Sequence, residues 1–197
     1  NDTSALDITL ESYEDLTKAS SDRYEFIYPN IQFTKDLFPP EMSSSLSLKT
    51  NLYQRQYETN KYEQSLITDL LYSGDTKFGL NGITRDFNLL IKNPNIRNKT
   101  GSNNQSNNEN KLLTKIMYSL SYPLKKQGQI YDGFLKPNLS LRFSPNNTKN
   151  ISKEDRRLGT NSINSFNRLS MINGVEGGQS LTAGFNYQLK NKAGQEK

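Results

Sequence analysis

The chain contains no cysteine and no histidine among its 197 residues. Without cysteine it can form neither a disulfide nor a thiolate metal site, and without histidine it lacks the most frequent general base and metal ligand. The sequence also has no run near 18 apolar residues, so it predicts no transmembrane helix. We therefore expect no metal and no cofactor, and no membrane span of the helical kind.

The first residues, Asn-Asp-Thr-Ser, have no initiator methionine and no basic segment followed by an apolar one, which is the pattern of a secretory signal peptide. We expect the sequence to be internal to a longer precursor.

Apolar residues are also scarce, since only 32% of the chain is hydrophobic. Globular proteins have roughly 45–50% on a count that includes glycine. Asn, Ser, Gln and Thr take the place of the apolar residues, and the short polar ones compete with helical backbone hydrogen bonds. The 11 tyrosines and 9 phenylalanines are too many for a typical disordered chain. This composition favours half-buried strands over long helices.

The net charge is +5, with 25 basic and 20 acidic residues. The basic side chains are scattered between acidic ones and form no stripe of the kind that binds nucleic acid. We expect no nucleic-acid partner.

The clearest pattern has a period of two. From 135 to 143 the odd positions are apolar and the even ones polar, apart from Pro137 among the odd, and the same alternation returns from 181 to 189. In an extended chain these two sets point to opposite faces. Further predicted strands cover 6–10, 46–53 and 116–122, and weaker candidates cover 27–33, 66–72, 78–83 and 87–91.

Turn-forming or polar segments separate these runs. They are Pro39-Pro40, 73–75, the Asn/Ser tract 98–110, 125–128 and the stretch 146–161. Eight or nine strands joined by short turns and a few long polar loops are typical of an antiparallel meander in a transmembrane β-barrel. A soluble sandwich also alternates apolar and polar residues, so the pattern leaves both architectures open.

Two features of the sequence could suggest a catalytic or phosphate-binding site. Carboxylate pairs such as Glu11 with Glu14 have no apolar pocket implied around them, so we interpret them as solvated charges and expect that the chain is not an enzyme. Glycines 174, 177 and 178 are followed by a strand pattern and not by a helix start. They therefore indicate a turn or bulge with positive φ and not a phosphate loop.

Three ordered pieces in the last third of the chain resemble a known family. Residues 135–146 read Leu-Lys-Pro-Asn-Leu-Ser-Leu-Arg-Phe-Ser-Pro-Asn, residues 161–170 read Asn-Ser-Ile-Asn-Ser-Phe-Asn-Arg-Leu-Ser, and residues 173–187 read Asn-Gly-Val-Glu-Gly-Gly-Gln-Ser-Leu-Thr-Ala-Gly-Phe-Asn-Tyr. This succession resembles the barrel domain of the LptD, or organic-solvent-tolerance, family. The positions that match its motifs are Pro137, Pro145, Phe166, Asn167, Arg168, Gly174, Glu176, Gly178, Gly184 and Tyr187.

The resemblance extends upstream and has departures. Tyr28-Pro29-Asn30-Ile31 is similar to a strand entry of the family, and 46–53 and 118–123 are similar to later strands. Lys136 stands where the family often has an acidic residue, Leu169 where it has an aromatic one, and Asn173-Gly174-Val175 lacks the usual Asp-Arg. These departures affect the loop contacts and leave the strand pattern intact.

The resemblance implies that residues 1–197 are a segment of an all-β barrel in the outer membrane of a Gram-negative cell. The family's amino-terminal jelly-roll domain and cysteine framework are not represented in these residues. The implied activity is lipopolysaccharide transport and assembly. The implied partners are lipopolysaccharide, an LptE-like plug lipoprotein, an LptA-like periplasmic bridge acting through the jelly-roll domain, and outer-membrane lipid.

Within this interpretation each alternating residue has an expected face. The lipid-facing set is Leu135, Leu139, Leu141, Phe143, Leu181, Phe185, Tyr187 and Leu189, and the lumen-facing set is Asn138, Arg142, Asn186 and Gln188. We expect the polar loop 149–161 to fold into or over the barrel mouth and Arg168 to pair with an acidic residue such as Glu176. Two alternatives stay open: another outer-membrane barrel, either a porin or a receptor, and a soluble carbohydrate-binding or adhesive β-sandwich.

Overall fold

A computed structural model describes residues 4–18, 22–57, 61–79, 81–100, 105–146, 162–168 and 174–191. These residues form eleven β-strands and no helix. The strands are β1 (Ser4–Glu14), β2 (Tyr24–Asp36), β3 (Ser45–Tyr57), β4 (Lys61–Ser73), β5 (Lys77–Phe78), β6 (Thr84–Thr100), β7 (Gln105–Asn110), β8 (Leu113–Ser121), β9 (Leu124–Gln127), β10 (Tyr131–Ser144) and β11 (Gly178–Asn191).

The strands form an open, antiparallel, all-β sheet. Hydrogen bonds connect them in the order β1-β2-β3-β4-β6-β8-β10-β11, while β5 and β7 pair with β6 and β9 pairs with β10. Strands that are neighbours in this order are close in sequence, which is the arrangement of a meander. The all-β prediction is confirmed.

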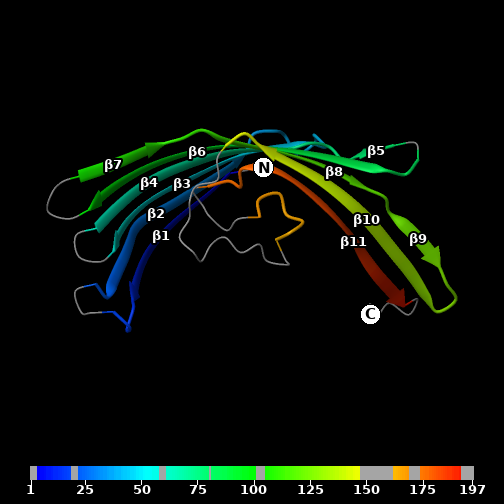
Figure 1. Ribbon diagram of the computed structural model, residues 1–197, viewed down its shortest axis with the longest axis horizontal. Coiled ribbons are helices and arrows are strands. Elements are labelled where there is room, and N and C mark those ends of the chain that lie inside the picture. Colours follow the sequence, from blue (N-terminus) through cyan, green and yellow to red (C-terminus); the bar gives the residue numbers. More distant parts are fainter. Residues whose placement is uncertain are drawn as a thin grey trace. The chain divides into compact units, whose positions relative to one another are not determined.

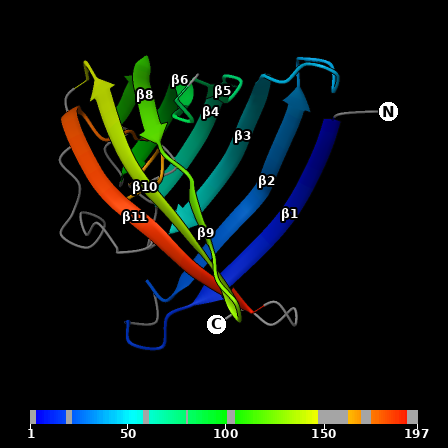
Figure 2. The ribbon, with the colours of Figure 1, turned by 90° about the vertical axis from the view of Figure 1, so that its right-hand side faces the viewer.

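The chain divides into two compact units. Unit 1 contains residues 1–72, 90–113 and 172–174, and unit 2 contains 73–89, 114–171 and 175–197. In unit 1, β1, β2 and β3 lie side by side (Figure 2). In unit 2, β10 pairs with β11 on one side and with β8 and β9 on the other (Figure 1).

The strands of unit 2 expose apolar side chains and bury polar ones. In β10 the exposed residues are Leu139, Leu141 and Phe143, whereas the alternating Ser140, Arg142 and Ser144 are buried. In β11 the side chains of Leu181 and Phe185 are 67% and 70% exposed, and Thr182 between them is buried. The predicted separation of the two sets onto opposite faces is confirmed for these positions.

The pairing of β10 with β11 places the predicted apolar positions opposite one another. Leu141 pairs with Leu181, Leu139 with Ala183, and Leu135 with Tyr187. Leu135 and Leu189 are only half-buried, and Asn186 and Gln188 are exposed although they belong to the polar set. At that end of β11, therefore, burial does not distinguish the two faces, and the register alone assigns them.

A bulge in β2 keeps Phe26 and Ile31 of this strand on one face. Phe26 pairs with Ser12 of β1 and Ile31 pairs with Ile8, so the apolar positions change from even to odd numbers within one strand. The register shift lies between Ile27 and Asn30 and includes Pro29, which has no N–H to donate to a ladder. An extra residue at this point reverses the parity without turning the apolar side chains to the other face.

Three predicted boundaries were wrong. The tract 98–110 was expected to be a connection, but β6 continues to Thr100 and β7 begins at Gln105, with the two strands paired through Asn95–Asn110 and Thr100–Gln105. Backbone ladder bonds need no apolar side chain, so a polar hairpin forms there. Residues 125–127 of the expected connection 125–128 belong to β9, which pairs with 132–135. The strand expected at 78–83 ends at Phe78, because Gly82 has a φ of +76° and turns the chain.

The expected loop 149–161 lies outside the described residues. No helix of the described chain combines the length and the apolar character needed to cross a membrane.

Candidate functional site

The polar face of unit 2 carries two completely buried basic side chains. Lys115 of β8 and Arg142 of β10 are each 1% exposed. Both alternate with exposed apolar neighbours, since Ile116 follows Lys115 and Leu141 and Phe143 flank Arg142. The period of two therefore forces these charges to the same side as the serines and threonines of the strands.

Arg142 attaches a non-strand segment to the sheet. We call residues 162–168 and 175–177 the inner segment; its first part is orange in Figure 1. The Arg142 guanidinium donates from Nε to the carbonyl of Ser165 at 3.0 Å and from Nη2 to the carbonyl of Ile163 at 3.3 Å. It also donates from Nη1 to Thr182 Oγ1 of β11 at 2.9 Å. All three acceptors are neutral oxygens.

Glu176 connects both parts of the inner segment to the sheet. Its Oε2 accepts hydrogen bonds from Lys115 Nζ at 3.1 Å and from Arg168 Nε at 2.9 Å, and Arg168 Nη2 contacts its Oε1. The predicted pairing of Arg168 with Glu176 is confirmed. Burial raises the pKa of the Glu176 carboxyl, but the hydrogen bonds from Arg168 and Lys115 outweigh it, so the pKa lies below its ordinary value.

Gly184 leaves room for the inner segment to approach β11. A Cβ at this position would lie 3.1 Å from Asn138 Oδ1 and 3.7 Å from Asn164 Oδ1. Asn164 belongs to the inner segment, and Asn138 belongs to β10 opposite Gly184. The 3.1 Å approach would require the Asn138 side chain to shift, whereas the 3.7 Å approach is an ordinary contact, so the glycine allows close packing here and is not needed for an unusual backbone conformation.

The other residues named from the family motifs fall at several places. Pro137 pairs with Phe185 inside the sheet, and Pro145 comes directly after β10. Gly178 begins β11 with a φ of +83°, as expected for a turn glycine, and Gly174 is buried. Phe166 and Asn167 are half-buried in the inner segment, and Tyr187 is exposed on the apolar side of β11.

Sequence reasoning missed Lys115. Its position on the polar parity of β8 was visible in the sequence, but its partner Glu176 is 61 residues away. Only the tertiary pairing of β8 with β10 and the course of the chain after β10 bring the two together.

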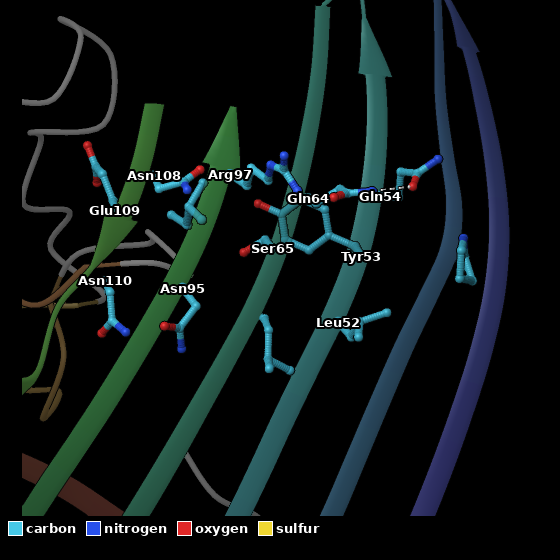
Figure 3. A pocket seen from close by; sticks show the side chains of 13 residues that line it. Leu52, Tyr53, Gln54, Gln64, Ser65, Asn95, Arg97, Asn108, Glu109 and Asn110 are labelled. Atoms are coloured by element: carbon cyan, nitrogen blue, oxygen red, sulfur yellow. Dashed lines mark hydrogen bonds between the residues drawn. The ribbon is translucent and has the colours of Figure 1, made fainter. Parts of the chain in front are cut away.

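Unit 1 has a separate groove of about 570 Å³, formed by β3, β4, β6 and β7 together with Pro29 (Figure 3). Its lining is rich in amide side chains, and Gln64 Nε2 donates to Gln54 Oε1 at 2.9 Å. Beside it, Tyr53 donates its hydroxyl to Glu63 at 2.6 Å. The residues labelled in the figure are Leu52, Tyr53, Gln54, Gln64, Ser65, Asn95, Arg97, Asn108, Glu109 and Asn110.

These two sites offer fixed charges and hydrogen-bonding groups. Within the described part of the chain, no group of three or more His, Cys, Asp or Glu side chains is placed to hold a metal ion. The chemistry that the two sites can support is the binding of polar or anionic groups.

No protein-family model matches the chain, and a search of curated proteins finds no match.

Proposed function

We propose that the chain is a segment of an outer-membrane β-barrel of the LptD type and takes part in lipopolysaccharide assembly. The observation that supports this proposal is the inverted distribution of side chains: large apolar residues are exposed along the strands while Lys115 and Arg142 are buried. In a barrel of this kind the exposed face contacts lipid and the polar face lines the lumen.

The energetics favour lipid over water as the medium of the apolar face. Burying one large apolar side chain stabilises a protein by about 1.5–3 kcal/mol. Among the described residues only five hydrophobic side chains are buried, whereas ten polar or charged ones are. A water-soluble sandwich buries its apolar face between two sheets. Lipid around the strands would remove the apolar side chains from water and give the same stabilisation without a second sheet.

The choice of the LptD type rests on the motif pieces near the inner segment. Arg168 from the second piece and Glu176 from the third form an ion pair, and Gly184, also from the third piece, lies close to Asn164 of the same segment. In this proposal lipopolysaccharide arrives through an LptA-like bridge, an LptE-like lipoprotein fills the lumen, and the glycolipid leaves into the outer leaflet. The strands described above would form part of the wall along which it moves.

Depletion of the protein from its native Gram-negative cell tests the activity. We expect newly made lipopolysaccharide to stop reaching the cell surface and to accumulate in the periplasm and inner membrane, measured by surface labelling and membrane fractionation. If surface lipopolysaccharide is unchanged and the uptake of small solutes falls, the chain belongs to a porin or receptor barrel. If the protein is found free of membranes, the barrel proposal itself is wrong.

A further inference from the structure

The cluster on the polar face of unit 2 has more positive than negative charge. Lys115, Arg142 and Arg168 are cations that are at least nine-tenths buried, and among the described residues Glu176 is the carboxylate that they share. Three positive charges face one negative charge. Buried charges without a counter-charge are strongly unfavourable, so among the described residues this arrangement favours an anion with more charge than the single carboxylate of Glu176.

The hydrogen bonds indicate where such an anion fits. Glu176 accepts from Lys115 Nζ at 3.1 Å and from Arg168 Nε at 2.9 Å, and it lies two residues before the start of β11 at Gly178. Lys115 belongs to strand β8, whereas Arg168 and Glu176 lie in the two parts of the inner segment, the first of which is bound by Arg142 at Ser165 and Ile163. Lys115 and Arg168 therefore both present donors to the position that the Glu176 carboxylate occupies.

A phosphate monoester suits these donors better than a carboxylate. It carries a charge of about −1.5 to −2 at neutral pH and three strong acceptor oxygens. A guanidinium and an ammonium group together bind such oxygens with charge-assisted hydrogen bonds. When Glu176 has moved away, the dianion balances two of the three positive charges, whereas the carboxylate balances one.

We propose that a phosphate monoester binds the Lys115–Arg168 pair by displacing the Glu176 carboxylate, which acts as an internal substitute for the anion. The inference rests on unit 2 alone and does not depend on lipopolysaccharide transport. Displacement frees residues 175–177 from the sheet, so binding of the anion is coupled to the position of the inner segment.

Calorimetric titration of the full chain folded in phosphate-free detergent micelles tests this inference. The probe is glucose 1-phosphate, with glucose as the neutral control and potassium chloride added to match ionic strength. We expect saturable binding of glucose 1-phosphate only. Titration with phosphatidic acid in the micelles presents the same group on a lipid. Binding of either compound supports the proposal, and the tighter binder identifies the source of the phosphate.

Three variants assign the site. Glu176→Gln removes the negative charge that competes with the phosphate. We expect this variant to bind glucose 1-phosphate about tenfold more tightly, because the phosphate no longer has to replace a charge-assisted hydrogen bond. Arg168→Gln and Lys115→Met should abolish binding, while Lys126→Met on the exposed strand β9 should not. Circular dichroism checks that each variant keeps its strand content. If Lys115→Met does not fold, Arg168→Gln tests the site alone, because Arg168 lies outside the strands. Absence of binding to both phosphate compounds, or unchanged affinity in Glu176→Gln, overturns the proposal.

Discussion

Glu176 controls the inner segment through its charge. The pKa of its carboxyl is lower in the folded chain than its ordinary value, because Arg168 and Lys115 donate hydrogen bonds to the ionised form. A group with a depressed pKa contributes stability above its unfolded pKa, and that contribution is lost as the pH falls through the folded pKa. Lys115, Arg142 and Arg168 keep their charges over this range, so protonation of Glu176 leaves three cations without a counter-charge.

We therefore predict that acid loosens the inner segment. Because the chain has no native cysteine, a nitroxide attached to Ile163→Cys reports on this segment alone. Its mobility should rise as the pH falls below about 4.3, the ordinary value of a glutamate. In Glu176→Gln the label should be mobile at every pH. An identical pH profile in both proteins would show that another group is responsible.

Gly184 provides a second test of the inner segment. Replacement by leucine places side-chain atoms where Asn138 and Asn164 now lie, so we predict that Gly184→Leu displaces the segment and raises the mobility of the label at position 163. The matched control is Ala183→Leu, since Ala183 is exposed on the opposite face of the same strand. Equal behaviour of the two variants would contradict the described packing.

Part of this site could be predicted from the sequence. The parity of β10 assigned Arg142 to the polar face, and the order of the motif pieces suggested the pairing of Arg168 with Glu176. The bonds from Arg142 to Ser165 and Ile163 could not be predicted, because their acceptors are backbone carbonyls that carry no sequence signal. Lys115 was missed for a different reason, since its partner is distant in the sequence.

The two faces of a strand should respond differently to the same charge. Phe185 and Asn186 are neighbours in β11, and Phe185 is 70% exposed on the apolar side. We predict that Phe185→Arg lowers the stability of the chain folded in phospholipid vesicles by about 2–4 kcal/mol near the bilayer midplane. Asn186→Arg should have a much smaller effect. Denaturant unfolding in vesicles measures both, and the reverse order would mean that the faces are inverted.

Strands predicted from strong apolar–polar alternation were correct, whereas connections predicted from composition were less accurate. The runs 135–143 and 181–189 fall inside β10 and β11, where apolar and polar residues alternate apart from Pro137. The hairpin of β6 and β7 was missed because Asn and Ser are typical of turns, although backbone pairing alone holds its strands together. The bulge at Pro29 explains why the alternation in β2 was weak, since the parity changes within the strand.

Over the whole chain, polar burial and apolar exposure occur in both units. In unit 1 Asn51 is buried beside the exposed Leu52, and Lys92 is buried and paired with Asp69 at 2.7 Å. In unit 2 the same relation holds for Lys115 and Ile116 in β8, along residues 139–144 of β10, and for Leu181 and Thr182 in β11. The barrel proposal explains this repeated inversion by an apolar solvent on one side of the strands, and this explanation is its central claim.

Lipid contact along β10 tests the central claim most directly. Single cysteines at positions 139–144, each carrying a small fluorophore, are folded into vesicles that contain brominated lipids. We predict strong quenching at 139, 141 and 143 and weak quenching at 140, 142 and 144. Uniformly weak quenching, from a chain that remains in the aqueous phase, would contradict the account.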